Sequence, residues 1–126
     1  MSASLLLLVL TGCGPGDLTV NVDTVPCENI DLDDPPEVDV VVEQDGNITT
    51  LSRVPLFKEC GATFEPDVLA DGAVIEVDEL WSAGDGDCCY QAELAIKAEN
   101  SGAEVEVLWY EGDAAEPLHT IAFSTP

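Results

Sequence analysis

The sequence predicts an all-β fold, specifically a small antiparallel β-sandwich of immunoglobulin-like size with about seven short strands. Apolar and polar residues alternate in several short runs, as expected for strands with one buried face. Glycine, proline, asparagine and aspartate separate these runs at short intervals. No long segment has a helical period, which excludes a helical bundle and leaves a small barrel as the alternative architecture.

The first half of the domain contains three expected strands. Residues 17–23 alternate between apolar and polar side chains. Residues 38–43 and 48–53 flank Asp45-Gly46-Asn47, whose residue types tolerate positive φ, so this pair is expected to form a hairpin. Residues 54–57 contain a proline, which cannot donate to a strand ladder, and are therefore expected to form a short edge-like piece.

The second half begins with residues 65–72, where a proline near the start and a glycine at the end predict one helical turn. Four more strands follow, each with apolar residues at every second position. These expected strands cover residues 73–80, 90–98, 104–110 and 118–124.

Residues 1–12 are expected to be a signal segment. The apolar run at 5–10 is shorter than the roughly 20 residues that a membrane-spanning helix requires. It suits the apolar region of a secretory signal, which has about 7–15 residues. A buried strand over 5–10 is the alternative, but the glycines and proline of residues 12–16 would break it.

The end of this segment, Leu10-Thr11-Gly12-Cys13, resembles the lipobox of bacterial lipoprotein precursors. The resemblance implies cleavage before Cys13, a thioether-linked diacylglycerol on its sulfur, and a further acyl chain such as palmitate on its amine. Each buried methylene contributes about 0.8 kcal/mol of membrane affinity, so two or three chains anchor a protein stably. Because Gly14 follows in place of aspartate, the resemblance favours the outer membrane within the cell envelope.

The mature chain is then expected to have two parts: a flexible lipidated tether over 13–17 and a single acidic β domain over 18–126. Its length leaves room for one domain. Apolar residues make up 46% of the chain, with many valines and isoleucines, so a folded core is expected rather than disorder.

The charge balance is strongly acidic. Three basic residues, Arg53, Lys58 and Lys97, stand against 26 acidic ones, which gives a formal net charge of −23. Nucleic-acid binding depends on basic side chains that neutralise phosphates, so nucleic acid is excluded as a partner. Spread negative charge favours a soluble monomer, and adaptation to high salt is the alternative interpretation.

Apart from Cys13, the chain has Cys27, Cys60, Cys88 and Cys89. In an exported chain these are expected to form two disulfides. Linking the neighbours Cys88 and Cys89 would require a strained ring, so Cys27 and Cys60 are each expected to pair with one of them. The chain lacks the spacings of a zinc site, the ligands of a blue-copper site and a redox C-x-x-C motif.

Two acidic loops are weak calcium candidates, one with Asp31 and Asp33 and one with Asp85 and Asp87. Neither matches the pattern of an EF-hand, so no cofactor is expected. His119 is the only histidine and shares the phase of Ile121 and Phe123, which predicts a partly buried side chain rather than a catalytic base. No catalytic residues are assigned.

These features lead to one expected function and two alternatives. We expect a cell-envelope lipoprotein, anchored through its lipid, whose domain has a non-catalytic interaction or structural role with an unidentified protein or envelope polymer. The first alternative is a calcium-dependent adhesion or ligand-binding domain. The second is an envelope enzyme.

Overall fold

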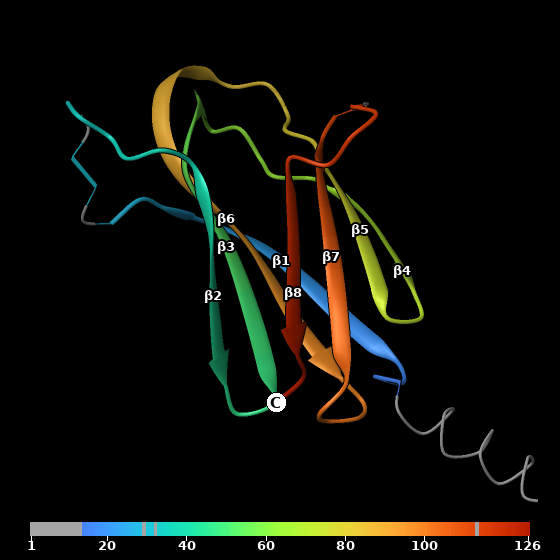
Figure 1. Cartoon of the computed structure of the whole chain (residues 1–126). Helices are drawn as coiled ribbons and strands as arrows, with labels where there is room; N and C mark the ends of the chain where they lie inside the picture. Colours follow the sequence, from blue (N-terminus) through green and yellow to red (C-terminus); the bar gives the residue numbers. More distant parts are fainter. Residues whose placement is uncertain (1–13, 29, 32, 113) are drawn as a thin grey trace, which may run out of the picture.

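The computed structural model describes residues 14–28, 30, 31, 33–112 and 114–126. These residues form eight strands in two four-stranded sheets (Figure 1). The strands are β1 (Leu18–Pro26), β2 (Asp39–Asp45), β3 (Ile48–Cys60), β4 (Asp67–Asp71), β5 (Val74–Glu79), β6 (Asp85–Ala98), β7 (Glu104–Glu111) and β8 (His119–Ser124). The predicted all-β sandwich is confirmed, with eight strands instead of about seven. A membrane-spanning helix is not among the elements of these described segments.

The first sheet has the order β1-β6-β3-β2, and all its pairs are antiparallel. The hairpin expected at residues 45–47 joins β2 to β3, with Asp45 opposite Ile48. On β6 the buried residues are Ala92, Leu94 and Ile96, which are the positions that the alternation places inward.

The second sheet has the order β4-β5-β7-β8 and departs from a purely antiparallel sandwich, because β5 and β7 run parallel. The reason is the path of the chain. After β5 it crosses to the first sheet, runs back along that sheet as β6, and returns as β7 from the end at which β5 began. Parallel neighbours require such a crossover, here made by a strand of the opposite sheet.

Two local expectations are wrong. Residues 67–71 form strand β4 instead of a helical turn, because Gly72, with φ +61°, allows a tight turn in which Asp71 pairs with Val74. Residues 54–57 belong to the 13-residue strand β3 instead of a short separate piece, although β2 pairs with β3 only as far as Val54, so residues 55–57 do lie at a local edge. A bulge between Arg53 and Leu56 accommodates the proline there.

The hydrophobic core fills the space between the sheets. It draws on the inner faces of β3, β5, β6 and β7 and includes a fully buried indole, that of Trp109. Phe64 stacks on this indole with ring centroids 6.3 Å apart. The core residues are Leu51, Leu56, Phe64, Ile75, Val77, Ala92, Leu94, Ile96, Val105, Val107, Trp109 and Phe123.

The segment expected as a flexible tether is docked on the domain from Gly14 onward. Pro15 is buried, and backbone hydrogen bonds join this segment to Glu99 and Asn100 at the end of β6. Cys13 and the expected signal segment lie outside the described residues.

Candidate functional site

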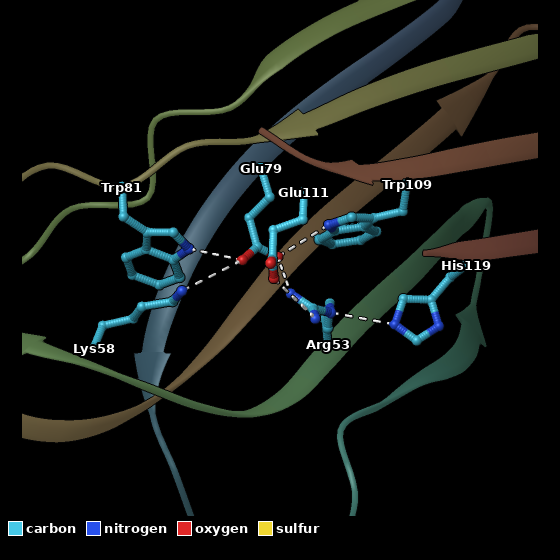
Figure 2. Close-up of polar contacts among 7 residues, drawn as sticks. All are labelled: Arg53, Lys58, Glu79, Trp81, Trp109, Glu111 and His119. Atoms are coloured by element: carbon cyan, nitrogen blue, oxygen red, sulfur yellow. Dashed lines mark hydrogen bonds and ion pairs between the residues drawn. The ribbon is translucent and has the colours of Figure 1, made fainter. Parts of the chain in front are cut away.

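Charged and aromatic side chains meet between the two sheets near the end at which β5 and β7 finish (Figure 2). Strand β3 supplies two cations, and the opposite sheet supplies carboxylates, an indole and the imidazole. We call this group the Glu79 cluster; its members are Arg53, Lys58, Glu79, Trp81, Trp109, Glu111 and His119. It contains both tryptophans, the only histidine and two of the three basic residues of the chain.

The carboxylate of Glu79 is the centre of the cluster, and its side chain is only 1% exposed. One oxygen, Oε1, accepts hydrogen bonds from Arg53 Nη1 and from Trp109 Nε1, the latter at 3.0 Å. The other, Oε2, accepts from Trp81 Nε1 at 3.0 Å and lies 3.9 Å from Lys58 Nζ. A buried carboxylate requires such partners, because an unpaired one would cost several kcal/mol.

Arg53 connects this carboxylate to the edge of the second sheet. Its Nη2 lies 3.7 Å from Glu111 Oε2, and its Nε donates to His119 Nε2 at 3.2 Å. An arginine nitrogen is always a donor, so Nε2 of His119 must accept. The imidazole is therefore neutral in this arrangement, with its proton on Nδ1.

The surroundings of His119 favour that neutral form. Burial lowers its pKa below the ordinary value of 6.5, and the charge of Arg53 lowers it further. The carboxylates of Asp39 and Glu79 oppose this shift in pKa without reversing it. The lowered pKa and the hydrogen bond from Arg53 thus both favour the neutral imidazole.

Two cations of β3 face the opposite sheet, Arg53 before the bulge in this strand and the partly exposed Lys58 after it. Leu51 and Arg53 share the inward phase of the strand, and the bulge then resets the alternation so that Leu56 and Lys58 also face inward. The residue paired with Arg53 is Ala92, whose small side chain leaves space between the sheets.

The polar groups of this arrangement are paired with one another. The two most buried charged side chains, Arg53 and Glu79, form an ion pair with each other. The imidazole of His119 accepts a hydrogen bond from Arg53 through Nε2. No buried side-chain nitrogen or oxygen within the described ranges lacks a hydrogen-bond partner. The cluster can therefore hold the two sheets in one alignment.

Both expected disulfides are present, Cys27–Cys89 and Cys60–Cys88, with Cα–Cα distances of 5.4 and 5.0 Å. The structure thus resolves the choice that the sequence left open. Strand β6 lies between β1 and β3, so its adjacent cysteines reach the neighbouring segment on either side.

Two clefts open near these disulfides. One has a volume of about 440 Å³ and is lined by residues that include Phe57, Lys58 and Trp81. The other has a volume of about 530 Å³, and its lining residues include Pro26, Tyr90 and the cysteines Cys27, Cys88 and Cys89. Phe57, which lines the first of these clefts, is 48% exposed.

The calcium candidates lie in two separate segments, and the expectation of an acidic loop is wrong for one of them, because Asp85 and Asp87 belong to strand β6. Asp85 and Asp87 are exposed at the start of β6. Asp31 and Asp33 are exposed in the connection between β1 and β2, where the Asp33 amide donates to Asp31 Oδ1 at 3.0 Å. No group of three or more His, Cys, Asp or Glu residues that could hold a metal ion occurs in the part of the chain that the structure describes.

The sequence interpretation assigned the half-buried position of His119 but missed the rest of the cluster. A signal was present, since Arg53 and Glu79 each continue an inward-facing alternation, after Leu51 and after Ile75 and Val77. Two charges of opposite sign on inward phases indicate an ion pair between sheets.

Comparisons with known proteins add no relative: no protein family, no curated protein and no solved structure matches this chain.

Proposed function

We propose that this protein is an exported lipoprotein of the cell envelope, anchored in the outer membrane by lipid on Cys13. One observation carries the proposal. Of the five cysteines, four are paired in disulfides, and the fifth is the residue at the lipobox position. The disulfides favour an oxidising compartment, which export provides. The remaining cysteine, Cys13, is the one that lipidation would use.

We further propose that the domain has a non-catalytic interaction or structural role. The groups that acid–base chemistry would require are engaged with one another in the Glu79 cluster. Outside it, the two clefts near the disulfides offer the most concave surface for a partner. The high negative charge keeps such a domain soluble and favours a monomer.

The test is to express the full chain in a bacterium with two membranes and to compare Cys13→Ser with the parent protein. We expect the parent protein in the membrane fraction, with a mass that corresponds to a chain beginning at a diacylated Cys13. Cys13→Ser should be released or left unprocessed. A double variant, Cys27→Ser with Cys89→Ser, is the matched control, because it removes two cysteines and leaves the anchor. An unlipidated parent protein that begins at Met1 would refute the proposal.

A further inference from the structure

The segment that follows the lipobox cysteine is hydrogen-bonded to the domain through the carbonyls of Gly14, Pro15 and Asp17. The Asn100 amide donates to the Pro15 carbonyl at 2.8 Å, and Asn100 Nδ2 donates to the Gly14 carbonyl at 3.1 Å. The Glu99 amide donates to the Asp17 carbonyl at 3.0 Å. Pro15 is buried between these bonds. The path from Gly14 into β1 is therefore part of the folded domain.

The docking of residues 14–17 requires a glycine at position 16. Its φ is +72°, in the region that favours glycine, and a Cβ added there would lie 2.9 Å from Glu99 Cβ. The same Cβ would lie 3.1 Å from Asn100 Nδ2. Gly14, by contrast, has open space around its Cα and no positive φ. One glycine is required for the docking, and its neighbour two positions away is not.

The docking leaves no slack between Cys13 and the domain. Gly14 is held at the end of the sandwich where β1 begins, and a lipid on the preceding residue would be attached one Cα–Cα step of about 3.8 Å away. This end, seen at the bottom of Figure 1, also carries the β2–β3 and β6–β7 turns and the chain terminus after β8. At a rise of about 3.3 Å per residue, the nine residues of β1 place its other end about 30 Å away.

We propose that residues 14–17 are a rigid mount that makes the turn-bearing end of the sandwich the surface that faces the lipid headgroups. The inference rests on the proposed lipidation of Cys13. It adds that the domain stands upright on the bilayer, with both disulfides and both clefts at the far end. A partner that binds there meets the protein from the aqueous compartment, at a height fixed by the length of the strands.

The test uses lipidated protein in a supported phosphatidylcholine bilayer, with the thickness of the protein layer measured by neutron reflectometry. We expect the parent protein and Gly14→Ala to form a thin, sharply bounded layer. Gly16→Ala should give a broader layer. Ten Gly/Ser residues inserted between Cys13 and Gly14 should extend it by about 15–20 Å, the reach of a flexible linker of that length.

Hydrogen exchange on the soluble Cys13→Ser protein provides the second measurement. The amides of Glu99 and Asn100 should be protected in that protein and in its Gly14→Ala form, and at least tenfold less protected after Gly16→Ala. Mass spectrometry of the bilayer sample distinguishes failure of the lipid anchor from failure of the rigid mount. A protein without lipid would refute the lipidation of Cys13 but not the docking of residues 14–17. A lipidated parent protein with a layer as broad as that of the linker insertion, or with unprotected Glu99 and Asn100 amides, would overturn the mount.

Discussion

The two halves of the space between the sheets are held together by different interactions. Toward the end where β5 and β7 begin, the contact is hydrocarbon, with Ile75, Val105 and Val107 almost fully buried. Toward the end where these strands finish, it is the Glu79 cluster, and the two disulfides lie in the sheet nearby. Apolar packing tolerates small shifts of one sheet over the other, whereas directional bonds to one carboxylate do not.

The difference suggests a division of roles. Hydrocarbon burial supplies stability in proportion to area. A buried ion pair is a poor source of net stability, but removing one partner is costly because the other charge is left uncompensated. We therefore interpret the apolar half as the main source of stability and the Glu79 cluster as the feature that fixes the alignment of the two sheets.

The largest expected effect compares three substitutions along β5. Glu79→Gln should destabilise the domain by about 3–5 kcal/mol, because Arg53 loses its buried counter-charge. Ile75→Val, in the apolar half, should cost about 0.5–1.5 kcal/mol. Glu76→Gln, on the exposed face, should stay within about 0.5 kcal/mol of the parent protein. Urea unfolding followed by tryptophan fluorescence measures all three, and a Glu79→Gln cost no greater than that of Ile75→Val would contradict the comparison.

The disulfides come next. Replacing either pair by alanines should cost about 2–4 kcal/mol. Cys27–Cys89 spans 62 residues and Cys60–Cys88 spans 28, so the loop-entropy relation predicts that the first contributes about 0.7 kcal/mol more. Thermal unfolding of the two double variants tests the order. The reverse order would mean that native contacts around Cys60 outweigh the constraint on the unfolded chain.

A smaller effect follows from the lowered pKa of His119. Above pH 6.5 the imidazole is neutral in both states, so its contribution is fully present. As the pH falls below 6.5, the unfolded chain takes up the proton first and stability is lost until the lower, folded-state pKa is passed. The free energy of unfolding, measured between pH 7.5 and 5, should fall, and His119→Gln should remove that part of the slope. An unchanged slope in the variant would assign it to other groups.

The smallest expected effect on stability, counted per residue, comes from repulsion between the surface carboxylates. Stability should rise gradually with sodium chloride, because screening shortens the Debye length from about 10 Å at 0.1 M to about 3 Å at 1 M. Millimolar calcium at constant ionic strength should add little to the melting temperature. A saturable calcium effect that disappears in the double variant Asp85→Asn with Asp87→Asn would instead favour the calcium-dependent alternative.

The buried faces of β6 and β7 were predictable from the sequence, because each strand carries its own alternation. Ala92, Leu94 and Ile96 on β6, and Val105, Val107 and Trp109 on β7, are buried as that pattern requires. The disulfides were predictable to within one choice, since adjacent cysteines cannot readily bond to each other.

The rest depends on contacts between segments far apart in the chain. The parallel pairing of β5 with β7 follows from which sheet β6 joins, and no local pattern encodes that choice. The bulge after Arg53 resets the phase of β3, so simple period-two counting fails there. The docking of residues 14–17 requires Asn100, which lies more than 80 positions away.

The most direct test of the central claim is a double-mutant cycle on Arg53 and Glu79, using Arg53→Met, Glu79→Gln and the double variant. Each single variant removes the closest partner of one buried charge and leaves only a longer contact, Lys58 to Glu79 at 3.9 Å or Glu111 to Arg53 at 3.7 Å. The double variant removes both charges and keeps an amide oxygen that can accept from Trp109. We predict that the double variant is more stable than the sum of the single effects implies, by about 2–3 kcal/mol. Single effects that add within about 0.5 kcal/mol would contradict the claim that this ion pair links the two sheets.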